Sequence, residues 1–171
     1  MAGTTNRIAE EAELSIGSLY QYFPNKDAIL RALMTAHADA GIALVRQRLL
    51  GGLPPRLDDT LRLFVRATID NHRDSPRLHR VLFEEAPRAP AFLKHLHDVE
   101  RQVVDATVLL LEQQPGIHAS RLKAQIVVTT IESLVHRLIT SPNPVDPQQL
   151  EEEIVTLLSS YLDQSEGPAV D

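Results

Sequence analysis

One short stretch of the chain holds the side chains best suited to specific non-covalent contacts. On an expected helix they share the exposed face, and they are Gly17, Ser18, Gln21 and Tyr22. Glycine permits close backbone approach, polar groups can hydrogen-bond to base edges, and a phenol can contact phosphates. The opposite face carries Leu19 and Phe23, which we expect to be buried. These residue types are suited to contacts with DNA.

Two short helices would position this face. Thr4 to Ala12 has helical apolar spacing, and the Thr4 hydroxyl is a suitable N-cap. Glu13-Leu14-Ser15 is typical of a tight turn, and Ser15 can cap a second helix, Ile16 to Tyr22. Two helices joined by a turn of about three or four residues form a helix-turn-helix, whose second helix enters a major groove.

The next helix supplies one more expected contact. Asn25 can cap it, which leaves Lys26 in its first turn. Backbone N–H groups and an ammonium could both meet one phosphate there. The alternative is a helical hairpin that does not bind DNA, because any soluble all-α protein can show the same periodicity.

The order of residues in this region resembles the DNA-binding motif of the TetR family of transcriptional regulators. The matching segments are TTNRIAEEA and SIGSLYQYFPNKDA, with Gly17, Tyr20, Tyr22, Phe23 and Lys26 in register. The resemblance implies an all-α homodimer, usually a repressor, that leaves a palindromic operator when a small-molecule effector binds the C-terminal domain. It also implies that both threonines and the Lys26 ammonium touch phosphates. The implied DNA-binding residues are Thr4, Thr5, Ile16, Gly17, Ser18, Tyr20, Gln21, Tyr22 and Lys26.

The chain departs from the family pattern at two places. Glu13 stands where the family usually has glycine, at a turn position that often needs positive φ, and it adds a negative charge near DNA. Family members also carry a whole helix and a basic arm before the position of Thr4, where this chain has only three residues. We therefore expect a shortened family member that lacks the first helix of the DNA-binding domain.

Composition and charge narrow the class of protein. The chain has 171 residues, 43% of them hydrophobic, and no cysteine, which excludes disulfides, cysteine-ligated zinc and thiol catalysis. We expect no apolar run long enough to cross a membrane and no signal peptide, which fits a cytoplasmic protein. The net charge is −6, which argues against indiscriminate nucleic-acid binding.

The rest of the chain shows helical periodicity throughout, with no convincing strand. We expect helices over 25–50, 56–73, 76–85, 91–114, 118–139 and 148–162, separated by glycine- and proline-containing breaks. The fold class is all-α and TetR-like, with a helix-turn-helix head and a helical ligand-binding and dimerisation domain. We place the domains at 1–46, with the motif at 4–23, and at 47–171.

The last two helices carry more apolar surface than one core needs. Two such helices from each subunit would form a four-helix bundle across a two-fold axis, although both could instead close a monomeric core. The expected dimer residues are Leu122, Ile126, Ile131, Leu134, Leu138, Leu150, Ile154, Leu157, Leu158 and Tyr161.

The resemblance places an effector pocket among the helices between Arg56 and Gln114. Its candidate wall is Phe64, Thr68, His72, Phe83, Phe92, Leu96 and Val103, and ordinary core packing explains the apolar members as well. We interpret His72 and His79 as surface histidines.

Two other classes of protein share some of these sequence features. A helical metalloenzyme or metal sensor could use His72, His79, Glu84-Glu85 and the pair His95-x-His97, but an i, i+2 pair diverges on a helix. The usual catalytic motifs are missing from the sequence, so we predict no enzyme, no cofactor and no metal site. A dimeric ligand-binding or scaffold protein whose truncated head no longer binds DNA is the alternative to a regulator.

Overall fold

The computed structural model describes residues 4–73, 78–79, 81–82 and 90–163, apart from the side chains at positions 91 and 92. Its elements are α1 (Thr5–Glu11), α2 (Ile16–Tyr22), α3 (Lys26–Arg48), the 3-10 turn η1 (Leu49–Gly51), α4 (Leu57–Arg73), α6 (Pro90–Leu111), α7 (Arg121–Ile139) and α8 (Pro147–Asp163). Within the described ranges no strand is present, and the predicted all-α class is confirmed.

Side-chain caps start the first three helices where the sequence predicted them. The Thr4 hydroxyl accepts from the Arg7 amide at 3.4 Å, and the Ser15 hydroxyl accepts from the Ser18 amide at 3.0 Å. The Asn25 carbonyl oxygen accepts from the Ala28 amide at 2.9 Å. Each cap satisfies a backbone donor that has no partner inside its own helix.

The turn between α1 and α2 depends on a left-handed residue. Glu13 has φ of 54°, the only positive φ of a non-glycine residue in the described part of the chain. The amide of Leu14 then donates to the carbonyl of Ala9 at 2.9 Å, which closes the end of α1. The predicted need for positive φ at this position is confirmed, and glutamate meets it at a cost in strain.

The main core lies in the body of the molecule. Helix α4 packs against α3, α7 and α8, and α6 packs against α3 and α7. Apolar stripes at helical spacing supply the buried side chains, among them Leu61, Val65, Val104, Leu111, Val127, Val135, Ile154 and Leu158. A second cluster joins Leu30 and Met34 of α3 to Leu82.

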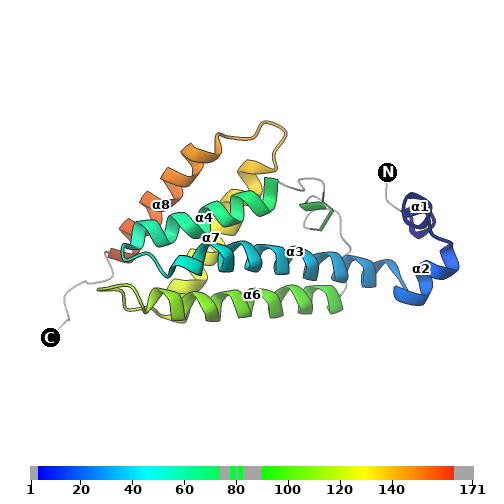
Figure 1. The fold of residues 1–171 in the computed structure, drawn as a ribbon, viewed down its shortest axis with the longest axis horizontal. Helices are drawn as coiled ribbons and strands as arrows, with labels where there is room; N and C mark the ends of the chain where they lie inside the picture. The colour runs from blue at the N-terminus through cyan, green and yellow to red at the C-terminus, as the bar shows by residue number, and fades with distance from the viewer. Residues whose placement is uncertain (1–3, 74–77, 80, 83–89, 164–171) are drawn as a thin grey trace.

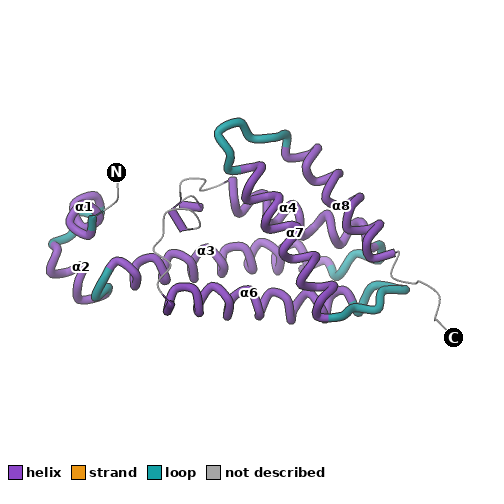
Figure 2. Tube along the Cα trace, turned by 180° about the vertical axis from the view of Figure 1, so that it is seen from behind, coloured by secondary structure: helices purple, strands orange, loops and turns teal. Residues whose placement is uncertain are grey.

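Helix α3 connects the N-terminal helices to this body. Figure 1 shows it lying alongside α6, with α1 and α2 beyond its N-terminal end and α4, α7 and α8 gathered over its other half, and Figure 2 shows the same arrangement from behind. The head has its own small cluster of Ala9, Leu19 and Ile29, the last contributed by α3. Any tilt of α3 therefore moves the head relative to the body.

By length and composition, one helix of the described chain is apolar enough to cross a membrane, and it spans Lys26–Gly51. The expectation that the chain has no apolar run long enough to cross a membrane is therefore wrong. The same segment carries Arg31 and Asp39, which would be costly in the centre of a bilayer. It also packs against α4 and α6.

Helix bounds agree with the predicted periodicity to within a few residues. The largest shifts are at α6, which ends at Leu111, and at α7, which begins at Arg121. Helix α8 begins with Pro147, and the Asp146 carboxylate accepts from the amides of Gln148 and Gln149 at 2.8 and 2.9 Å. The predicted helix over 76–85 lies largely outside the described residues.

Candidate nucleic-acid interface

Helix α2 buries one side and leaves the other open. Leu19 lies in the head cluster, while Gly17, Gln21 and Tyr22 are exposed, with 76% of Tyr22 accessible. Ile16 and Tyr20 are exposed large side chains on the same short helix. The face that the sequence assigned to base contacts is thus available to a partner.

Ser18 differs from the expectation. It was predicted to be exposed, but it is only partly so, and its hydroxyl lies 2.8 Å from the hydroxyl of Ser15. The cap of α2 therefore engages this side chain, which reduces its freedom to meet DNA. A serine three residues after an N-cap serine is the sequence signal for this contact.

A hydrogen bond between Thr5 and Tyr20 joins the two helices of the motif. Their hydroxyl oxygens lie 3.1 Å apart, and residue 5 is partly buried. The contact fixes the two hydroxyls beside each other on the surface of the head. Thr4, by contrast, is exposed at the start of α1.

Gly17 has no structural reason to be glycine. A Cβ built at this position would meet only the Ser15 hydroxyl oxygen, at 3.8 Å, an ordinary van der Waals contact. Its φ lies outside the positive range, so the backbone does not require glycine either. The lack of a side chain leaves the backbone of α2 accessible at the centre of the exposed face.

Lys26 opens the longest helix of the molecule that the structure describes. It is partly buried and directly follows the Asn25 cap, so it stands at the N-terminus of α3, where the first backbone amides lack partners inside the helix. Elsewhere in the head, Arg7 lies 4.0 Å from Glu11, and both are exposed, so the pair is weak. With Glu10 and Glu13 nearby in sequence, the acids between Thr4 and Lys26 outnumber the two cations, Arg7 and Lys26, by one.

The residues predicted for dimerisation divide into two groups. Ile131, Leu150, Ile154 and Leu158 are buried in the core of the single chain. Leu122 and Leu157 are exposed, at 68% and 54%, and the other four are partly buried. Leu122 and Leu157 present the most apolar surface that this chain leaves uncovered.

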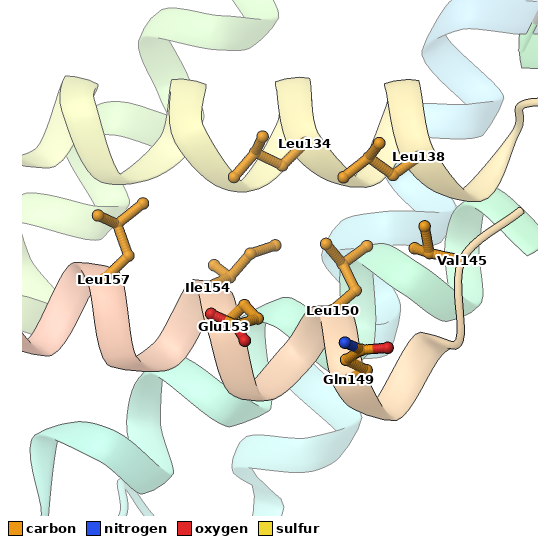
Figure 3. A pocket seen from close by; sticks show the side chains of 8 residues that line it. All are labelled: Leu134, Leu138, Val145, Gln149, Leu150, Glu153, Ile154 and Leu157. Atoms are coloured by element: carbon orange, nitrogen blue, oxygen red, sulfur yellow. The ribbon is translucent and has the colours of Figure 1, made fainter.

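An apolar groove of about 390 Å³ runs between α7 and α8. Figure 3 shows Leu134 and Leu138 of α7 facing Leu150, Ile154 and Leu157 of α8, with Val145 of the connector at one end. Gln149 and Glu153 add polar groups on the α8 side. Five of the residues predicted for dimerisation therefore line one continuous depression.

The predicted effector residues are spread over several environments. Phe64 packs on the main core, whereas Leu96 packs on the cluster of Leu30, Met34 and Leu82. The Thr68 hydroxyl donates to the Phe64 carbonyl at 3.0 Å, and Val103 is partly buried. Phe83 and the side chain of Phe92 lie outside the described residues.

The interpretation of His72 and His79 as surface histidines is wrong, because both are 0% exposed. Their ring centroids lie 3.8 Å apart in a stacked arrangement, and the ring of His37 lies 4.1 Å from that of His79 at a steep angle. The sequence held a signal for His72, since it continues the buried stripe of Leu61 and Val65 at helical spacing. It held no signal for the meeting of three separate segments.

Comparisons with known proteins agree with this geometry. The family model "Bacterial regulatory proteins, tetR family" matches residues 1–33, and "Tetracyclin repressor-like, C-terminal domain" matches residues 57–162. A search of curated proteins found no match.

Solved structures share the fold at low sequence identity. The fatty acid degradation regulator FadR from Bacillus halodurans has a TM-score of 0.78 and 18% identity, over 91% of this chain and 83% of that one. A regulatory protein in the tetR family from Rhodococcus RHA1 has a TM-score of 0.72 and 20% identity, over 94% and 86%. The TetR family transcriptional regulator PfmR from Thermus thermophilus has a TM-score of 0.66 and 16% identity, over 92% and 87%. The chain belongs to the TetR family of DNA-binding transcriptional regulators.

Proposed function

We propose that the protein is a homodimeric repressor that places α2 in the major groove of a palindromic operator and releases it when a small molecule binds the helical body. The observation that carries this proposal is the open face of α2, where Gly17, Gln21 and Tyr22 stand exposed while Leu19 anchors the helix from behind. As a regulator of bacterial genes it would act in the cytoplasm and catalyse no reaction.

Individual contacts in this proposal have different consequences for specificity. Gln21 is exposed on α2 and can form paired hydrogen bonds with an adenine edge, so it contributes to the choice of sequence. Tyr22 and Lys26 reach phosphates, together with Thr4 and Thr5, and therefore strengthen binding to all sequences alike.

A salt-titrated binding assay tests these roles, using palindromes from the region upstream of the protein's own gene. Lys26→Ala should weaken binding to every DNA equally and reduce the salt slope by about 1. Gln21→Ala should relax preference at one base pair, by about 1–3 kcal/mol. Lys94→Ala removes the same charge from an exposed site on α6 and serves as the matched control.

The proposal fails if the wild-type chain prefers no palindrome over random DNA at any salt concentration. Equal loss on all sequences for Gln21→Ala would contradict its role in base recognition. Equal losses of DNA affinity in Lys94→Ala and Lys26→Ala would show that Lys26 acts only through the overall charge of the protein.

The second copy of the chain would pack on α7 and α8. The groove lined by Leu134, Leu138 and Leu157 is apolar, and Leu157 is itself 54% exposed. Two α7–α8 pairs related by a two-fold axis would bury these side chains in a four-helix bundle.

Sedimentation of matched variants tests this interface. Leu157→Asp should shift the wild-type dimer to monomer, because it places a carboxylate in the apolar contact. Leu50→Asp makes the same change at a highly exposed leucine of η1 and should leave the dimer intact. A monomeric wild-type chain, or a Leu157→Asp dimer as stable as wild type, would refute this interface.

The effector would bind between α4 and α6, where Thr68, Leu96 and Val103 are partly buried. A movement there can reach the head, because α3 packs against both helices. A ligand that raises the melting temperature and lowers operator affinity supports this part of the proposal. Ligands that stabilise the body without changing operator affinity contradict it.

A further inference from the structure

Three histidines from separate segments meet inside the body. His37 comes from α3, His72 from α4 and His79 from the segment at 78–79. One candidate ligand nitrogen from each lies within 4.8 Å of the other two. Imidazole nitrogens on one tetrahedral ion lie roughly 3.3 Å apart, given metal–nitrogen bonds of about 2.0–2.1 Å. Each distance between two of these nitrogens would therefore need to shorten by about 1.5 Å or less for all three to bind one ion.

A backbone hydrogen bond already orients His72 as a metal ligand would be oriented. Its Nδ1 lies 2.8 Å from the Thr68 carbonyl oxygen, and since a carbonyl only accepts, Nδ1 carries the proton. The lone pair of the neutral ring is therefore on Nε2, which is buried and has no hydrogen-bond partner within the described residues. Donation of the other ring N–H to a backbone carbonyl is the usual outer contact of a metal-bound histidine.

His37 is held by Asn71 from the neighbouring helix. The Asn71 amide nitrogen lies 3.1 Å from His37 Nε2 and 3.4 Å from the His37 carbonyl oxygen, and it donates to both. This contact keeps a lone pair on Nε2. An incoming ion could take that lone pair in exchange for the amide, because Asn71 would keep the carbonyl as its partner.

All three imidazoles are in the state that binds metals. Burial lowers the pKa of His72 to about 4. The hydrogen bond to the Thr68 carbonyl acts to raise this pKa, and the nearby His37 and His136 lower it further. Burial, followed by the nearby His72, His37 and His136, lowers the pKa of His79 to about 2. Burial and His136 also lower the pKa of His37. Uncharged rings near neutral pH need lose no proton to bind a cation.

Ordinary packing does not account well for the cluster. His72 and His79 are both fully buried and stacked at 3.8 Å between centroids. A buried ring nitrogen without a hydrogen bond costs free energy that a leucine of similar size would avoid. A cation bound to the His72 Nε2 lone pair would recover that cost.

Helix α7 offers further ligands beside the three rings. A Glu132 carboxylate oxygen lies 3.6 Å from His72 Nε2, and the Glu132 side chain is 53% exposed, so it links the cluster to solvent. The ring of His136 lies 5.6 Å from that of His79 and 6.0 Å from that of His72. Burial raises the pKa of Glu132 to about 7, so metal binding would favour its ionised form, which would offset part of the ion's charge.

We propose that His37, His72 and His79 form a binding site for a divalent d-block cation, best matched by Zn²⁺, with Glu132 as the nearest fourth ligand. Neutral imidazole suits zinc and its neighbours, and four-coordinate zinc is commonly held by three histidines and one oxygen ligand. The proposal revises the expectation of no metal site. It does not depend on the protein's binding to DNA.

Metal titration of the full, untagged chain after chelator treatment tests the proposal. Zn²⁺ should bind with one ion per chain and raise the melting temperature, and Co²⁺ should give the visible absorption of a four-coordinate nitrogen-ligated ion. His37→Gln should weaken Zn²⁺ binding by at least about 100-fold, since even outer-contact losses cost about 10–100-fold. His97→Gln changes an exposed histidine of α6 and should bind like wild type.

Two results would overturn the proposal. One is wild-type protein that binds less than half an equivalent of Zn²⁺ at micromolar concentration. The other is a folded His37→Gln variant that binds as tightly as wild type, which would place the ion elsewhere. If His37→Gln does not fold, X-ray absorption of the wild-type Zn²⁺ complex decides, because fewer than two imidazole ligands would refute the site.

Discussion

Gly17→Ala separates DNA recognition from the stability of the fold. The new methyl group would meet only the Ser15 hydroxyl oxygen at 3.8 Å, so nothing inside the protein must move. The backbone there is ordinary α-helix within α2, a conformation that alanine prefers. Any loss of DNA affinity therefore reports a contact made outside the chain.

The two effects have opposite signs. Alanine in place of a helical glycine stabilises by about 0.5–1 kcal/mol, and a position in the first turn should give the lower value. An extra methyl group in a tightly packed contact costs about 1–3 kcal/mol. At the operator this corresponds to roughly 5–150-fold weaker binding. The variant should be slightly more stable and bind clearly less well.

Urea denaturation and fluorescence anisotropy on labelled operator DNA measure the two quantities. Gly51→Ala is the matched control, because a Cβ there meets nothing within 4 Å and Gly51 lies in η1, outside α1 and α2. It should leave operator affinity unchanged. Wild-type affinity in Gly17→Ala would show that the backbone of α2 does not approach DNA, and the proposed docking would be refuted.

Three further changes test other parts of the structure. Glu13→Gly removes a side chain held at φ of 54°, so we expect about 0.5–1 kcal/mol more stability and tighter DNA binding; an unchanged urea midpoint would contradict the strain. Glu151 is buried between Arg62 and Arg66, with N–O distances of 3.2 and 2.6 Å, and both arginines are partly solvated. Glu151→Gln should therefore cost about 1–2 kcal/mol in urea denaturation, and a loss below about 0.3 kcal/mol would refute the pairing. Gln114→Leu should cost about 1–3 kcal/mol by thermal denaturation, because it leaves the Pro54 carbonyl and Thr60 hydroxyl without this donor. The exposed Gln113→Leu should cost much less, and equal losses would contradict the buried network.

Local patterns in the sequence predicted most of the secondary structure and the identity of the head. The side chains of Thr4, Ser15 and Asn25 cap helices within three residues of themselves, so their roles need no knowledge of the rest of the chain. The same holds for the turn at Glu13, whose positive φ follows from the tight connection between two helices. The TetR motif can be recognised in the sequence because its contacts join residues that are close together along the chain.

Packing between the helices determines which apolar side chains remain at the surface. Leu157 and Leu158 are neighbours with the same chemistry, yet Leu158 is buried in the core and Leu157 borders the open groove. Helical periodicity shows that α7 and α8 each have apolar faces, but only their packing against α4 determines which face is already covered. The proposed dimer surface depends on that distinction.

The histidine cluster depended entirely on tertiary contacts. His37, His72 and His79 are ordinary isolated residues in sequence, and no spacing rule relates a position in α3 to one in α4 or at 79. The packing of α3 on α4 brings His37 beside His72, and His79 joins them from the segment at 78–79; His72 and His79 are buried and His37 is partly buried. The helices and the DNA-reading motif could be predicted from the sequence, because they depend on neighbours three or four residues away. The buried histidines and the open groove depend on contacts between distant segments, which only the folded chain provides.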